Sequence, residues 1–225
     1  MCFSPQISLL TAVVEFILAA LIIARFRKSA VARFAAIFIF LLGFYQLTEF
    51  MLCTTGDIDA WARMGFITYT FLPALGLHLV FKLSDKMPKA FVFYIPAIIF
   101  AGLAAFSKGF VVGGACHSVF ISVHLMFLNP SANSILYLIY GAYYAGFIFL
   151  GCFLAGLMLR KEKDEKKRKK MIVGLAAVLL ATVPALLFVI IMPALGNQFP
   201  SIYCEFALLM AIAGYCISYL DHNEK

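Results

Sequence analysis

Seven long apolar runs, separated by short polar or charged stretches, set the pattern of this chain. A helix that crosses a bilayer needs about 20 mostly apolar residues. Seven segments meet this requirement, at about 6–24, 34–53, 61–81, 90–106, 134–159, 171–192 and 202–220. Because every backbone N–H and C=O must be paired in hydrocarbon, runs of this length indicate helices rather than barrel strands. The pattern predicts an all-α fold, a seven-transmembrane-helix bundle in which residues 1–225 form a single integral membrane domain.

The positive charges between these runs predict their orientation. The connections 25–33, 82–89 and 160–170 carry four, three and eight Lys or Arg, whereas the opposite connections carry only Arg63 and Lys108. Basic residues concentrate on the cytoplasmic side of membrane proteins. No basic residue precedes the first run, so this run differs from a signal peptide and is expected to stay in the protein. The charges predict an N-terminus outside and a C-terminus in the cytoplasm.

Composition and net charge narrow the class of protein. The chain is 64% hydrophobic and only 13% charged, whereas soluble domains carry roughly a quarter charged residues. This excludes most soluble enzyme folds. The formal net charge of +7 falls mainly on the three basic connections, so it is explained by orientation. The run RKEKDEKKRKK at 160–170 is expected to attract anionic lipid head groups, and nucleic acid is not an expected partner.

The longest connection, residues 107–133, is predicted to be an outer loop with structure of its own. Its pair Gly113-Gly114 lies between apolar residues and the partly alternating stretch 118–127, a pattern typical of a β-hairpin. A loop of this length that is rich in apolar side chains either folds over the helices as a lid or lies in the membrane interface. The sequence leaves both interpretations open.

Polar residues near the predicted outer ends of the helices indicate a binding pocket. Gln46 and Glu49 share a face of the second run, and Glu205 lies at a similar depth in the last run. Ionisable groups in hydrocarbon are costly, so each is expected to have a partner or a function. The two acids can share a proton, bind a cation or hydrogen-bond across helices. His117, in the outer loop, lies near this proposed pocket and titrates near neutral pH.

Glu15 is the acid predicted to lie deepest in the membrane, near the middle of the first run. It shares a helix face with Ser8 and Thr11, at spacings of three and four residues. Either it hydrogen-bonds across helices or it has a function of its own.

Tyrosines form a stripe on the fifth run, where Tyr137, Tyr140 and Tyr144 lie on one face. Such a stripe is typical of the aromatic belt at a membrane interface, and it also suits the wall of a ligand cavity. The predicted ligand-binding residues are Gln46, Glu49, His117, Glu205, Tyr140 and Tyr144.

Four of the six cysteines are predicted at the outer face, where an oxidising environment favours disulfides. Four cysteines allow three pairings. Cys2 and Cys204 lie at the starts of two helices, and Cys53 and Cys116 join a helix end to the long loop, so these two pairs are preferred. Free thiols and a metal or redox site stay open as alternatives. The candidate metal ligands are Glu49, His117, Cys204 and Glu205.

Short motifs carry two resemblances. Met-Cys-Phe-Ser-Pro at 1–5, Gln46-Leu-Thr-Glu49, His117-Ser118-Val119 and Ser-Ile-Tyr-Cys at 201–204 resemble an uncharacterised family of bacterial multi-pass membrane proteins. That resemblance implies the bacterial inner (plasma) membrane and no particular activity. The stretch from Trp61 through Leu72-Pro73 to Leu77-His78 is similar to the third helix of seven-helix sensory modules of bacterial histidine kinases, which implies signalling through a partner.

The sequence therefore predicts a membrane protein with an outward-facing polar pocket that binds a small ligand or ion. Its expected role is that of a sensor or an accessory subunit, with membrane lipid and a second membrane protein as possible partners. An intramembrane metal-dependent hydrolase, a thiol oxidoreductase and a transporter stay open as alternatives. The sequence contains no recognisable catalytic motif, and it identifies no cofactor.

Overall fold

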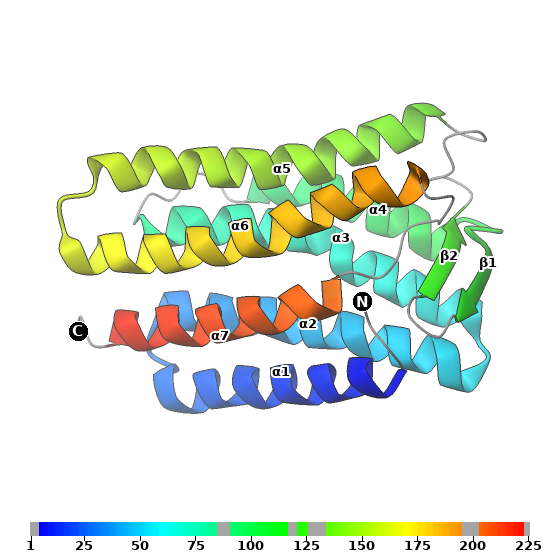
Figure 1. The fold of residues 1–225 in the computed structure, drawn as a ribbon, viewed down its shortest axis with the longest axis horizontal. Coiled ribbons are helices and arrows are strands. Elements are labelled where there is room, and N and C mark those ends of the chain that lie inside the picture. Colours follow the sequence, from blue (N-terminus) through cyan, green and yellow to red (C-terminus); the bar gives the residue numbers. More distant parts are fainter. Residues whose placement is uncertain (1–4, 85–90, 117–120, 126–133, 195–202, 223–225) are drawn as a thin grey trace.

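The computed structural model describes residues 5–84, 91–116, 121–125, 134–194 and 203–222, with side chains not described at 115, 121–122, 134, 180–194 and 203–206. The described residues form helices that run side by side and a two-stranded hairpin at one end of the bundle (Figure 1). The helices are α1 (Pro5–Phe26), α2 (Ala30–Thr55), α3 (Ile58–Leu83), α4 (Phe91–Phe106), α5 (Ser134–Lys161), α6 (Glu165–Ala194) and α7 (Tyr203–His222). The strands are β1 (Val111–Cys116) and β2 (Ile121–Leu125).

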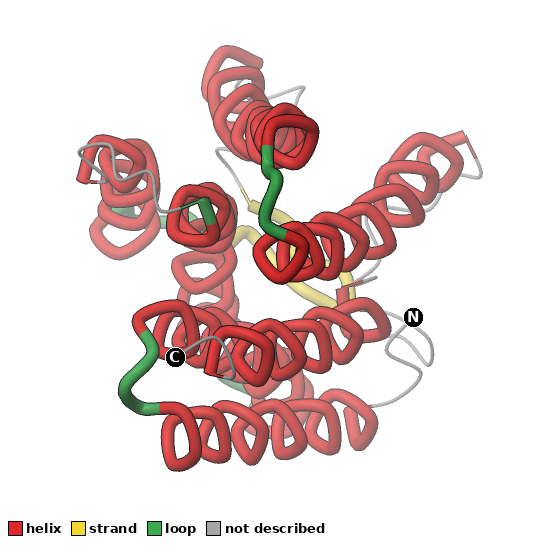
Figure 2. The backbone as a smooth tube through the Cα atoms, turned by 90° about the vertical axis from the view of Figure 1, so that its left-hand side faces the viewer, coloured by secondary structure: helices red, strands yellow, loops and turns green. Residues whose placement is uncertain are grey.

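Two ends of the bundle serve as landmarks. The hairpin end holds β1 and β2, and the basic end holds the α1–α2 and α5–α6 connections (Figure 1). Figure 2 looks along the bundle from the basic end, with the yellow hairpin lying behind the helices. Helix α2 is central, since it contacts α1, α3 and α7, while α3 also contacts α4 and α5.

Four helices of the described chain are long and apolar enough to cross a membrane: α1, α2, α3 and the segment Ile135–Lys161 of α5. The protein is therefore helical and has the length and composition of a membrane protein. Helix α4 and the apolar segment Ala207–His222 of α7 are shorter.

The structure corrects the predicted loop at 160–170. Helix α5 continues to Lys161 and α6 starts at Glu165, so most of the basic run is helical. Lys, Arg and Glu are good helix formers, which explains the extension beyond the apolar runs. Asp164 starts α6 because its carboxylate accepts the backbone N–H of Lys166 at 2.9 Å. This hydrogen bond, with a further one from the N–H of Lys167, lowers the pKa of Asp164.

Small residues bring α2 into close contact with three neighbours. A Cβ atom at Gly43 would lie 3.1 Å from the Cβ of Glu15 on α1. One at Gly214 of α7 would lie 2.8 Å from Ile39 Cδ1 of α2, and one at Gly65 of α3 would lie 2.8 Å from Thr48 Oγ1 of α2. Close packing of this kind is the main source of helix association in lipid.

The predicted β-hairpin is present and is packed on the helix ends. Strands β1 and β2 pair antiparallel, with Cys116 opposite Ile121. Val111 and Val123 pack against Leu52 of α2 and Ala62 of α3. A disulfide joins Cys53, near the end of α2, to Cys116 at the end of β1, with Cα atoms 5.9 Å apart. This is one of the two pairs that the sequence favours.

Arg63 fastens the same end. Its guanidinium donates to the carbonyl oxygens of Ala104 at 2.6 Å and Ser107 at 2.8 Å, which satisfies the end of α4. It also lies over the ring of Phe110, 5.6 Å from the centroid, and binds Asp59 at 2.6 Å. A charge predicted only as a loop residue therefore connects α3, α4 and the segment that leads into β1.

We expect the Cys53–Cys116 disulfide to stabilise the hairpin end, because it closes a segment with a sequence separation of 63 residues. The double variant Cys53→Ala/Cys116→Ala should lose about 2–4 kcal/mol of unfolding free energy. Chemical unfolding in detergent measures this loss, and Cys216→Ala, at an exposed free thiol, is the control. Alkylation of Cys53 and Cys116 in the folded protein without a reductant would contradict the pairing.

Candidate functional site

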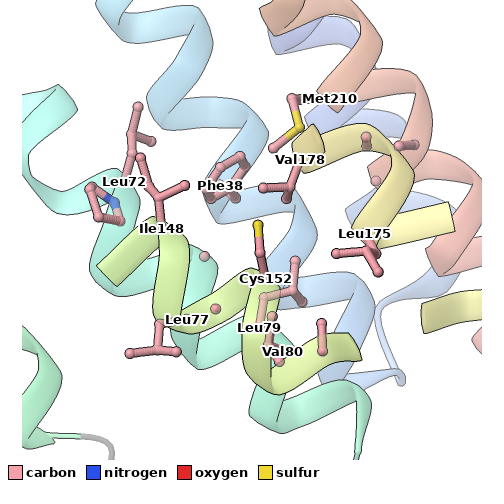
Figure 3. A pocket seen from close by; sticks show the side chains of 18 of the residues that line it. Phe38, Leu72, Leu77, Leu79, Val80, Ile148, Cys152, Leu175, Val178 and Met210 are labelled. Carbon is pink, nitrogen blue, oxygen red and sulfur yellow. The ribbon is translucent and has the colours of Figure 1, made fainter. Parts of the chain in front are cut away.

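The candidate site is a partly enclosed cavity of about 220 Å³ between α2, α3, α5, α6 and α7 (Figure 3). Its walls are almost entirely apolar. The polar side-chain atoms among the lining residues are the hydroxyls of Tyr45, Tyr69 and Tyr144 and the thiol of Cys152. The lining includes Phe38, Leu42, Leu72, Pro73, Gly76, Ile148, Gly151, Leu175, Val178, Met210 and Gly214.

Small residues and a proline leave room for the cavity. A Cβ at Gly76 would meet only Phe38, at 4.0 Å, so this wall has space for a larger side chain. Pro73 has no N–H and cannot donate to the carbonyl of Tyr69. The next carbonyl, that of Thr70, accepts the hydroxyl of Tyr143 at 2.6 Å, which holds α5 against α3 beside the cavity.

The three tyrosines of the lining are contributed by α2, α3 and α5. The rings of Tyr45 and Tyr69 meet edge to face with centroids 5.7 Å apart, and those of Tyr69 and Tyr144 do so at 6.0 Å. Among the lining residues of α2, α3 and α5, they are the ones nearest the hairpin end. A site of this composition suits an apolar molecule that has a polar group at one end.

Cys152 supplies a thiol within the cavity wall. Figure 3 shows its sulfur directed toward Phe38 and Val178, which come from α2 and α6. Cys152 is not among the predicted site residues, because a lone cysteine in an apolar run carries no signal of what its helix faces. Its position makes it a chemical reporter of whether the cavity is filled.

The predicted ligand-binding residues lie in different parts of the structure. Tyr144 lines the cavity. Tyr140 lies instead in an aromatic cluster, where its hydroxyl is 3.0 Å from Thr70 Oγ1 and its ring packs on Phe66 and Phe100. Tyr140 is only 8% exposed and does not line the cavity. Tyr140 and Tyr144 thus lie four positions apart on one face of α5, and the first is a core residue while the second lines the cavity.

Gln46 and Glu49 are buried on α2, with exposed fractions of 0% and 6%. At 100° per residue, Glu49 lies on the helix face that carries the cavity residues Leu42 and Tyr45, about one turn closer to the hairpin end. The predicted polar positions therefore lie beyond the tyrosine end of the cavity rather than in its walls.

The other predicted site residues lie outside the described part of the structure. Cys2 and His117 fall outside the described residues, and the side chains of Cys204 and Glu205 are not described. The Cys2–Cys204 pair and a pocket shared by Glu49 and Glu205 stay predictions. Among the residues described, no group of three or more His, Cys, Asp or Glu side chains is placed to hold a metal ion.

A buried polar cluster at the basic end is not among the predicted sites. Lys170 Nζ lies 2.9 Å from Asp221 Oδ1, and Ser29 Oγ donates to Asp221 Oδ2 at 2.5 Å. Ser29 also accepts the backbone N–H of Ala32, at 2.9 Å, as the N-cap of α2. We call Ser29, Lys170 and Asp221 the basic-end clasp, because they join the α1–α2 connection to α6 and α7.

The clasp changes the interpretation of the basic run. Lys170 was assigned to the lipid-attracting stretch 160–170, but it is only 3% exposed and is paired with Asp221. Most of the other basic residues of the run are exposed and are placed to meet lipid head groups. The sequence signal for this pair is its position, since Lys170 directly precedes the apolar run 171–192 and Asp221 directly follows the run 202–220.

Comparisons of this chain with protein-family models, with curated proteins and with solved structures find no match. The class that the fold defines is therefore stated from the structure itself: a helical membrane protein with an apolar cavity among its helices.

Breaking one partner of the basic-end clasp should be costly, because it leaves the other charge buried. We expect Lys170→Met to lower the unfolding free energy by about 3 kcal/mol. The exposed neighbour Lys169→Met is the matched control and should have little effect. Lys170→Met/Asp221→Leu should recover most of the loss. Unfolding in detergent measures all three, and equal stability of the Lys170→Met and Lys169→Met variants would contradict a buried pair.

Proposed function

We propose that the chain is a seven-span membrane protein that binds a small apolar molecule in the cavity and acts as a sensor or accessory subunit. The observation that carries this proposal is the apolar cavity with three tyrosines toward one end. Water is a poor occupant of such a space, because it needs several polar partners. An apolar molecule gains dispersion contacts with the walls, and a polar group at its end meets the tyrosines.

The cavity is formed by five helices, which supports a sensing role. Its lining residues come from α2 and α3 on one side and from α6 and α7 on another. A bound molecule contacts both groups, so it has different affinities for different packings of these helices. Differential affinity is what allows a ligand to shift a conformational equilibrium. The basic-end clasp joins α6 and α7 to the α1–α2 connection, so it lies where such a shift would reach the cytoplasmic side.

The proposed orientation places the hairpin end outside. A disulfide at that end suits an oxidising compartment, and the exposed basic residues at the other end suit the cytoplasm. The proposed location is the bacterial inner membrane, with anionic lipid at the exposed part of residues 160–170.

Filling the cavity should abolish binding. Gly76→Leu places a side chain in the space beside Phe38, whereas Gly102→Leu on α4 adds the same side chain where nothing lies within 4 Å of a Cβ. A photoactivatable palmitate analogue should label wild type and Gly102→Leu equally and Gly76→Leu several-fold less, measured on purified protein by peptide mapping. Equal labelling of all three would remove the cavity as the binding site.

Occupancy should also protect Cys152. We expect the palmitate analogue to slow the alkylation of Cys152 by an apolar maleimide several-fold, while the exposed thiol of Cys216 reacts at an unchanged rate. Intact-mass and peptide analysis follow both thiols in the same sample. Unprotected Cys152 at saturating analogue would contradict binding at this position.

The orientation is tested by adding one cysteine at a time to a Cys2→Ala/Cys152→Ala/Cys204→Ala/Cys216→Ala background, which keeps the Cys53–Cys116 disulfide. Val112→Cys replaces a residue of β1 that is 68% exposed, and Lys163→Cys replaces an exposed residue between α5 and α6. A membrane-impermeant maleimide added to intact cells should label Val112→Cys alone, and both variants after lysis. Labelling of Lys163→Cys in intact cells would reverse the proposed orientation.

A further inference from the structure

Glu15 stands apart from the other buried polar groups of the described chain. It lies at the middle of α1 and has an exposed fraction of 0%. Neither of its carboxylate oxygens has a hydrogen-bond partner within the part of the chain that the structure describes. The cavity does not include it, and its helix contributes no residue to the cavity lining.

The helix opposite makes room for this side chain. Gly43 of α2 faces Glu15, and a Cβ at Gly43 would lie 3.1 Å from the Cβ of Glu15 and from the ring of Phe16. Helical side chains lean toward the N-terminus of their own helix. The carboxyl group of Glu15 is therefore directed along the α1–α2 interface toward the hairpin end, where Pro5 starts α1.

The buried faces of α1 and α2 differ on the two sides of Glu15. Toward the hairpin end they carry the polar residues Ser8 and Gln46 together with Ala12, and all three are 0% exposed. Toward the basic end they carry only apolar residues, namely Ala19, Ile22, Phe26, Ala32, Ala36 and Ile39. The polar side chains of this interface thus lie between Glu15 and the hairpin end.

Few titratable groups face Glu15. On α2, Glu49 lies on the helix face that lines the cavity, about 120° around the helix from Gly43. On α7, Tyr215 packs on the neighbouring apolar cluster, and Asp221 is held by Lys170 at the basic end. The side chain of Glu205 lies outside the described residues. Within the described residues, Arg63 is paired with Asp59 and Lys170 with Asp221, and neither carboxylate oxygen of Glu15 has a hydrogen-bond partner.

An ionised carboxylate without a partner is too costly at this depth, whereas the neutral acid is tolerated. A divalent metal needs several oxygen ligands, and the described residues supply no such group. A proton needs only one. We propose that Glu15 is a proton-binding site inside the membrane, and that its proton exchanges with the hairpin end along Ser8 and Gln46.

Dicyclohexylcarbodiimide tests the first half of the proposal, because this apolar reagent reacts with protonated carboxyl groups. The acid O–H adds across one C=N bond, and the acyl group then moves from oxygen to nitrogen, which gives a stable N-acylurea without a leaving group. Peptide mapping of the full-length protein in lipid nanodiscs should locate the adduct on Glu15. Glu15→Gln should remove it, and the exposed Glu165 should stay unmodified. An unmodified Glu15 in folded protein would overturn the proposal.

Infrared spectroscopy gives an independent readout of the bound proton. The wild type should show a C=O band of a protonated carboxylic acid at neutral pH that is absent from Glu15→Gln, a nearly isosteric variant. In D₂O this band shifts as the proton exchanges. Gln46→Leu should slow the exchange at least several-fold, whereas Ile22→Leu, on the apolar side, should leave it unchanged. Absence of the band in wild type, or equal slowing by both variants, would overturn the proposal.

Discussion

The close approach of α2 to its three neighbours is the constraint on which the rest of this structure depends. Each contact is made at a glycine: Gly43 against α1, Gly65 against Thr48, and Gly214 against Ile39. Lipid tails are as apolar as these side chains, so no hydrophobic driving force brings the helices together. Helix association therefore relies on close packing and on a few polar contacts. The same contacts place Glu15 opposite Gly43 and bring α7 beside α2, where both contribute to the cavity.

Directional interactions at the two ends complement this packing. At the hairpin end, Arg63 and the Cys53–Cys116 disulfide fix α2, α3, α4 and β1. At the basic end, the clasp fixes α6 and α7 to the connection that precedes α2. Between them the cavity walls are apolar and offer few hydrogen bonds, so those walls resist a change of packing less than the ends do. A molecule bound in the cavity would therefore act on the least directional part of the bundle.

The sequence could predict what depends on one segment at a time. Long apolar runs predicted each helix, the Gly113-Gly114 pair predicted the hairpin, and the position of Cys53 and Cys116 at one end of the bundle favoured their pairing. The prediction of a loop at 160–170 was wrong, because Lys, Arg and Glu are good helix formers and most of this basic run is helical. The sequence does not show which side of a helix contacts which neighbouring helix. Tyr140 and Tyr144 share one face of α5, and only the packing of α5 on its neighbours shows that Tyr140 is buried against Phe66 and Phe100 while Tyr144 lines the cavity.

The same distinction explains why the candidate pocket differs from the predicted one. A polar residue is conspicuous within an apolar run, and the predicted pocket therefore combined Gln46 and Glu49 with residues that lie far away in the sequence. The cavity has walls of Leu, Phe, Val and Gly, which are indistinguishable in sequence from residues that face lipid. An apolar site in a membrane protein is therefore visible only once the helices are placed. A buried acid such as Glu15 is visible from its chemistry alone, and the structure adds that its partners are missing and that its surroundings are polar on one side only. Chemistry and packing thus identify different sites in this chain: packing identifies the cavity, and unsatisfied chemistry identifies Glu15.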